Sequence, residues 1–260
     1  MALTYGEYLK VEALLNLQQP LSDGPEHDEH LFIVIHQVYE LWFKQILHEM
    51  DLLTRSLESG QTETVMATFK RILTILKTLV AQVDVLETMT PISFTSFRTR
   101  LENASGFQSV QFREVEFLLG AKRPQMMNLL AEGDPARARL EKRLKSPSLY
   151  DCFLRYLAGQ GFPVPAEALA HDVTQPRTES EAIQALLIDI YHHHPSVAQV
   201  CERLVDLDEG LQEWRYRHVK MVERTIGFKK GTGGSSGAEY LRQTLFRPAF
   251  PDLWSIRAQL

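Results

Sequence analysis

Two histidines interrupt the apolar stripes of long amphipathic segments. In Val197–Ile226 apolar residues recur at helical spacing, and His218 stands where that spacing would place a leucine. His36 stands on the apolar face of Leu31–Leu53 in the same way. Such a histidine can be a core residue bonded to a backbone carbonyl, or a neutral imidazole that binds a metal or a haem iron in a dry cavity. Two helices that each direct one imidazole toward the core favour a shared site.

The histidine spacing does not fit a di-iron carboxylate centre, which needs a glutamate three residues before a histidine on each of two helices. Isoleucine, glutamine and arginine stand at that position before His36, His48 and His218. The run His192–His194 is a weak metal candidate, because adjacent residues of a helix point in different directions.

An aromatic residue and an arginine four positions apart indicate a site for a ligand with an apolar and an acidic part. Phe94 and Arg98 would lie on one face of a short helix. The arginine can hold a carboxylate while the ring lines an apolar slot, although an arginine that satisfies a helix end fits the spacing equally well. The basic residues from Arg215 to Lys230 are expected to form a mostly solvated face, with a few in contact with an anionic group.

Four glycines lie within seven positions at the end of Ile226–Gly237, which reads IGFKKGTGGSSG. Glycine is costly to order, so this concentration predicts a loop with a specific task for its backbone. The stretch is not a Walker A loop, and Ser236 occupies the place where a dinucleotide fingerprint starting at Gly231 needs its third glycine. A flexible tether is the alternative.

The composition is typical of a globular protein and argues against several classes. The chain of 260 residues has a formal net charge of −5, which argues against a general nucleic-acid binder. Cys152 and Cys201 are too few for a disulfide framework, and the N-terminal stretch lacks the features of a secretory signal. No apolar run has the length of a membrane span. We therefore expect a cytoplasmic protein.

The elements that must position these residues are helices. Apolar periodicity predicts long helices at Leu31–Leu53, Glu63–Met89 and Val197–Ile226, and no stretch shows convincing strand alternation. Shorter helices are predicted at Tyr5–Leu15, Phe94–Leu101, Ser109–Leu119, Gln125–Glu132, Ala136–Leu144, Ser148–Leu157, Glu179–Tyr191 and Ala238–Leu245. We expect a single all-α domain over 1–260, with long core helices, short covering helices and a small helical satellite subdomain at about 133–175.

Three long blocks carry a recognisable pattern. They read HDEHLFIVIHQVYELWFKQILHEMD from His27, SFTSFRTRLENASGFQSVQFR from Ser93 and RYRHVKMVERTIGFKKGTGGSSG from Arg215. Two further blocks read TYGEYLKVEALL near the start and FPDLWSIRAQL at the end, whereas about Gly120–His194 has no matching motif. In order and spacing these blocks closely resemble tryptophan 2,3-dioxygenase, a family of haem enzymes that open the indole ring.

The resemblance implies roles for the residues above. His218 matches the family's proximal haem ligand, which binds the metal, and His36 matches the catalytic distal histidine that accepts a hydrogen bond from the indole N–H. Arg98 matches the residue that pairs with the substrate carboxylate, and Thr232 matches the one that contacts the ammonium and carboxylate end. The glycine stretch is then a lid over that end of the substrate.

The resemblance also implies groups of pocket residues. The indole slot would be lined by Phe32, Ile33, Val34, Ile35, His36 and Phe94. The turn that lines the haem pocket would contain Ser105 and Gly106. In a homotetramer, the N-terminal segment 1–20 would reach a neighbouring subunit and complete its pocket with Tyr5, Tyr8 and Leu9.

The activity implied is insertion of O₂ across the indole C2–C3 bond of L-tryptophan on ferrous haem b, with one haem per subunit. The product is N-formyl-L-kynurenine, and the reaction is the first step of tryptophan degradation by the kynurenine route. Two alternatives stay open: a related haem protein that acts on another aromatic amino acid or an indole derivative, and a non-catalytic helical binding module. Neither nucleic acid nor a membrane is an expected partner.

Overall fold

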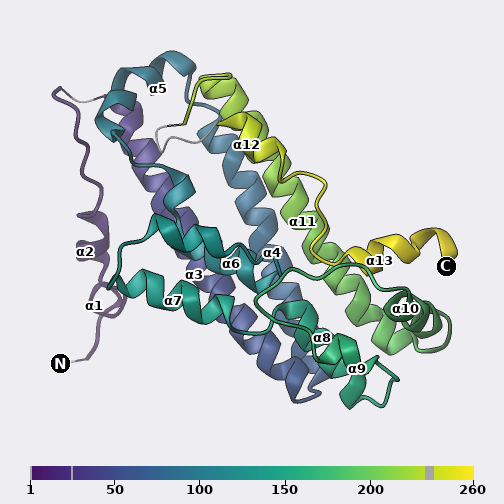
Figure 1. The fold of residues 1–260 in the computed structure, drawn as a ribbon. Coiled ribbons are helices and arrows are strands. Elements are labelled where there is room, and N and C mark those ends of the chain that lie inside the picture. Colours follow the sequence, from purple (N-terminus) through teal and green to yellow (C-terminus); the bar gives the residue numbers. More distant parts are fainter. Residues whose placement is uncertain (1, 25, 232–236) are drawn as a thin grey trace.

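The frame of the protein is a set of three long helices. The computed structural model describes residues 2–24, 26–231 and 237–260. The long helices are α3 (His27–Glu58), α4 (Thr62–Leu86) and α11 (Pro195–Ile226). They lie side by side, with α3 and α11 both packed against α4 (Figure 1). The described residues contain no strand, so the all-α prediction is confirmed.

Local sequence explains where the long helices begin and end. α11 starts with Pro195 in its first turn, where a missing backbone N–H leaves no helical hydrogen bond unmade. It ends before Gly227, which takes a φ of 59° that most other residues avoid. Near the start of α3, the Glu29 carboxylate accepts hydrogen bonds from the backbone N–H groups of Leu21 and Ser22 at 2.7 and 3.1 Å. These bonds attach the N-terminal segment to the frame.

Shorter helices cover this frame (Figure 1). The α-helices are α1 (Tyr5–Leu9), α2 (Val11–Leu15), α5 (Pro91–Arg98), α6 (Val110–Leu118), α7 (Pro135–Leu144), α8 (Leu149–Gly159), α9 (Ala166–Leu169), α10 (Glu181–His193), α12 (Ala238–Arg242) and α13 (Pro251–Ser255). The 3₁₀ segments are η1 (Thr99–Leu101), η2 (Gly106–Gln108), η3 (Pro124–Leu129) and η4 (Ile256–Gln259). The helix predicted at Tyr5–Leu15 is divided at Lys10, which has a left-handed φ of 54°. The one predicted at Gln125–Glu132 is instead the 3₁₀ segment η3.

The main hydrophobic core lies between the long helices and is completed by α8 and α10. Phe153 and Leu154 of α8 and Leu187 and Ile190 of α10 are fully buried in it. Burial of each such side chain contributes about 1.5–3 kcal/mol. Because α8 belongs to the range 133–175, that range is joined to the main core. None of the helices in the described part of the chain is long and apolar enough to cross a membrane.

A second, smaller cluster forms where α3, α4 and α5 meet. Its buried members are Ile35, Leu86, Met89, Phe94 and Phe97. α5 begins at this place because the Thr90 hydroxyl accepts a hydrogen bond from the backbone N–H of Ser93, and Pro91 occupies the first turn. The cluster therefore fixes α5 against the frame and orients the residues on its inner face.

Candidate active site

A cavity of about 260 Å³ lies between α3, α4, α5, α6, α11 and α12. Most of its wall is apolar and includes Phe32, Phe43, Leu86, Phe94, Phe112 and Trp214. The charged side chains that reach it are Glu40, Arg98, Arg113, Glu116 and Arg215. An apolar space with a few converging polar groups is the usual form of a small-molecule or cofactor site.

His218 of α11 faces this cavity. Its ring is stacked on Trp214, with 5.2 Å between centroids and an interplanar angle of 7°. Burial, together with a smaller effect of the nearby His36, lowers the pKa of His218 to about 4. Its imidazole has no hydrogen-bond partner among the residues described. His218 is therefore not a core histidine bonded to a backbone carbonyl. A neutral, unpartnered imidazole in a mostly apolar cavity is a suitable metal ligand.

His36 of α3 faces the same cavity with a different bonding pattern. Its Nδ1 lies 2.7 Å from the carbonyl oxygen of Phe32, one turn earlier in α3. A carbonyl only accepts, so Nδ1 carries the proton and Nε2 of the neutral ring is an acceptor. Burial lowers the pKa of His36, which favours this neutral form. The imidazole therefore presents one hydrogen-bond acceptor in a fixed orientation.

An aromatic slot adjoins the two histidines. The ring of Phe32 lies 5.7 Å from that of Phe94 and 5.6 Å from that of Phe97, measured between centroids. One turn along α5 from Phe94, Arg98 reaches the cavity and donates from Nη2 to the carbonyl oxygen of Lys230 at 2.6 Å. This is its one hydrogen bond among the described residues, so the other guanidinium N–H groups are free to bind an acid. Phe94 and Arg98 of α5 therefore both face the cavity, one with an apolar ring and the other with a guanidinium group.

The five consecutive residues expected to line the slot divide between two faces of α3. Phe32 and His36 line the cavity, whereas Ile33, Val34 and Ile35 do not. Residues four apart share a helix face, and the three between them turn away. Ile35 is buried in the cluster behind the slot, where it packs with Phe94. The resemblance identified the segment, and the helix period selects its two cavity residues.

The other predicted pocket residues are placed unequally. Ser105 and Gly106 line the cavity, and the Ser105 hydroxyl starts η2 by accepting from the N–H of Phe107 at 3.3 Å. Tyr5, Tyr8 and Leu9 are 77%, 72% and 46% exposed and lie away from the cavity of their own chain. Thr232 lies outside the described residues, as do the other residues from 233 to 236.

The two ends of the glycine stretch meet the cavity. Gly231 and Gly237 both line it. Gly237 has a φ of 65°, and a Cβ added there would lie 2.7 Å from the carbonyl oxygen of Lys229. This position requires glycine for both its conformation and its close backbone approach.

Alanine at position 237 is therefore expected to destabilise the protein. Gly133 is a matched control, because its φ of 83° is equally unfavourable for alanine, but an added Cβ would meet no atom within 4 Å. Gly133→Ala should cost about 1–2 kcal/mol from the backbone conformation alone. Gly237→Ala should lower the stability by about 1–3 kcal/mol more than Gly133→Ala does, because its methyl group collides with a backbone oxygen. Denaturant unfolding measures both, and equal losses would contradict this account.

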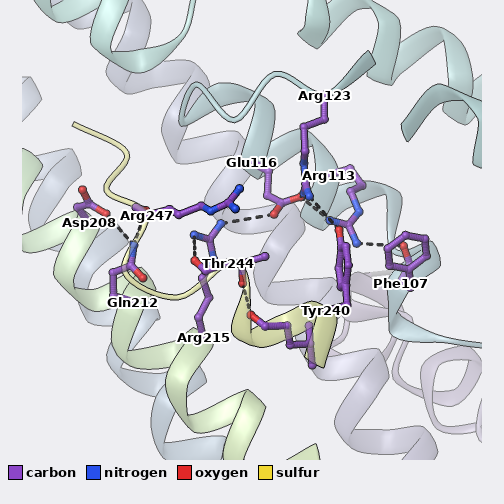
Figure 2. Close-up of polar contacts among 11 residues, drawn as sticks. Phe107, Arg113, Glu116, Arg123, Asp208, Gln212, Arg215, Tyr240, Thr244 and Arg247 are labelled. Atoms are coloured by element: carbon purple, nitrogen blue, oxygen red, sulfur yellow. Dashed lines mark hydrogen bonds and ion pairs between the residues drawn. The ribbon is translucent and has the colours of Figure 1, made fainter. Parts of the chain in front are cut away.

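A polar cluster beside the cavity was not predicted as such. Arg215, expected on a solvated face, has a side chain only 11% exposed and pairs with the buried Glu116 of α6 (Figure 2). Arg113 and Arg123 pair with the same carboxylate. One sequence feature could have indicated that Arg215 lies at the cavity: it stands three residues before His218 and thus near it on the surface of α11. The partner on α6 had no such signal, since it depends on tertiary packing.

Known proteins of one family are similar to most or all of this chain. The family model described as tryptophan 2,3-dioxygenase matches residues 1–136 and 167–260. A protein of that name from Herpetosiphon aurantiacus is 62% identical over 259 residues, covering 100% of this chain and 99% of its own. One from Anaeromyxobacter sp. (strain K) is 59% identical, covering 100% and 97%. One from Bacillus anthracis is 41% identical, covering 99% and 93%.

Fold and site thus define an all-α protein whose long helices enclose an apolar cavity with two neutral imidazoles and an arginine at its wall. The matched residues span both histidines and Arg98. The chain belongs to the tryptophan 2,3-dioxygenase family.

Proposed function

We propose that this protein is a haem-dependent dioxygenase that inserts O₂ across the indole C2–C3 bond of L-tryptophan and releases N-formyl-L-kynurenine, the first step of the kynurenine route. The observation that carries the proposal is the joint placement of His218, His36 and Arg98 on one cavity with an aromatic slot. The names of the full-length relatives support the same substrate and reaction.

The cavity residues fit a haem b. His218 would hold the iron, since its imidazole is neutral and has no other partner among the described residues. The apolar wall, with Ser105 and Gly106 at its edge, suits the faces and rim of a porphyrin. Haem would supply the oxygen chemistry, while the protein provides ligation, orientation and exclusion of water.

The remaining side chains would bind and orient the substrate. The indole ring would pack against the aromatic wall that contains Phe32 and Phe94, where its N–H could donate to Nε2 of His36. The free N–H groups of Arg98 would bind the substrate carboxylate. These contacts orient the indole C2–C3 bond, and the apolar wall excludes water from the reacting atoms. Thr232 at the ammonium and carboxylate end, with the glycine stretch as a lid, completes the proposed pocket.

The N-terminal segment would complete the pocket of a neighbouring subunit in a homotetramer. Leu3, Tyr5, Tyr8 and Leu15 are between 68% and 77% exposed in the single chain. Such a run of exposed apolar side chains supports burial against another subunit. The acidic net charge and the two buried thiols fit a protein of the cytoplasm.

The test combines spectroscopy with product analysis. Protein reconstituted with haemin and reduced under argon should show a Soret band that changes on addition of L-tryptophan. With ¹⁸O₂, mass spectrometry should find both labelled atoms in one product molecule. Tyrosine and indole are the comparison substrates. Product from either of these but none from tryptophan would favour a relative with another substrate, and absence of any Soret change with haemin would overturn the proposal.

A further inference from the structure

A buried arginine cluster borders the cavity beside α6 (Figure 2). Glu116 is 2% exposed and accepts hydrogen bonds from Arg113 Nη1 at 2.5 Å and Arg123 Nη2 at 2.6 Å. Arg215 Nη2 of α11 lies 3.4 Å from its other oxygen. Three positive charges around one negative charge leave these four groups with a formal charge of +2.

No second carboxylate bonds to these arginines among the residues described. Glu40, the other acid at the cavity wall, accepts instead from the side-chain amide of Gln111 at 2.8 Å. Burial lowers the pKa of Arg215, although Glu116 and Asp208 act to raise it. Uncompensated buried charge is costly. The cluster therefore favours an anionic group in the adjoining cavity.

The cluster also has hydrogen-bond donors that lack a described acceptor. Arg113 is 6% exposed and lines the cavity, and its Nε has no partner among the described residues. The Tyr240 hydroxyl of α12 accepts from Arg123 Nη1 at 2.8 Å, and its own proton has no described acceptor. Tyr240 and Arg215 line the cavity as well. These donors come from three elements and converge on one wall.

We infer that Arg113 and Arg215, with Tyr240 beside them, bind the two carboxylate groups of the porphyrin. This inference rests on the proposed haem cofactor and adds the residues that hold its acidic edge. Two carboxylates carry the charge that offsets +2, and guanidinium groups bind carboxylates with paired N–H donors. Arg98 on α5 is left for the substrate. Glu116 is a positioning residue, because its carboxylate holds the guanidinium groups at the wall and cannot itself bind a ligand acid.

The first experiment changes the ligand and leaves the protein unaltered. The apo-protein is titrated with haemin and with haemin dimethyl ester, whose carboxylates are neutral, and the Soret band reports binding. If two charge-assisted contacts are lost, the ester should bind more weakly by a factor between about a hundred and ten thousand. Equal affinity for the two porphyrins would overturn the inference. Binding of neither would overturn the haem proposal itself, so the two failures are distinguishable.

The second experiment assigns the preference to residues. In wild type the affinity for haemin should exceed that for the dimethyl ester. In Arg113→Gln and Arg215→Gln this haemin-to-ester affinity ratio should fall by about tenfold, since each variant removes one charged partner. Arg139→Gln is the control, because Arg139 pairs with Glu114 of the same helix α6 but does not line the cavity. It should keep the wild-type ratio. A full ratio in both cavity variants, with circular dichroism confirming their fold, would overturn the assignment to this cluster.

Discussion

Replacement of His218 by alanine is expected to abolish stable haem binding. His218 is the one cavity histidine whose ring nitrogens have no protein partner among the described residues, and its neutral form is favoured by burial. Without it no imidazole on α11 would remain to hold the iron, since the other cavity histidine, His36, lies on α3. Purified His218→Ala protein should therefore lack a Soret band after reconstitution and gel filtration.

The matched control is His36→Ala, which alters the other imidazole of the same cavity. It should retain haem, since His36 is assigned to the substrate. A full Soret band in His218→Ala would contradict the assignment of the iron ligand. Loss of haem in His36→Ala but not in His218→Ala would exchange the two roles.

Replacement of Arg98 by alanine is expected to raise the KM for L-tryptophan severely while haem stays bound. A charge-assisted bond between arginine and a carboxylate contributes about 1.5–3 kcal/mol, so kcat/KM should fall by a factor of about ten to a hundred. The neutral bond to His36 contributes roughly 1 kcal/mol, so its loss should cost only about fivefold. Steady-state kinetics of Arg98→Ala and His36→Ala measure both effects.

Two controls separate substrate binding from structure in Arg98. Arg98→Lys keeps the charge but loses the paired N–H donors, so its KM should lie between wild type and Arg98→Ala. Tryptamine lacks the carboxylate, so Arg98→Ala should affect its binding far less than that of tryptophan. An unchanged KM for tryptophan in Arg98→Ala would contradict the role.

The long helices could be predicted from sequence because each buries a continuous apolar stripe. α3, α4 and α11 begin and end within a few residues of the predicted bounds. α13 was not predicted, because its five residues are too few for a periodic pattern. It is held by tertiary contacts, among them the bond from the Trp254 indole N–H to Asp208 at 3.0 Å. Such contacts between distant segments leave no local signal.

The candidate site could be predicted in part. His218 and His36 were found because each is a polar residue in an apolar stripe, yet the stripes alone did not show that both face one cavity. The family resemblance supplied their roles. The paired arginines around Glu116 could not be inferred, since a buried ion pair between α6 and α11 depends on how these helices pack. Arg215 therefore looked like a solvated basic residue.

The bond between Arg98 and the Lys230 carbonyl would link the proposed recognition of the substrate carboxylate to the backbone that leads into the glycine stretch. A carboxylate that draws the guanidinium group away weakens this bond, and any displacement of Lys230 changes the position of the group that meets the carboxylate. By thermodynamic reciprocity, each event must alter the free energy of the other by the same amount. The affinity for the amino acid and the position of this backbone segment would thus be thermodynamically coupled.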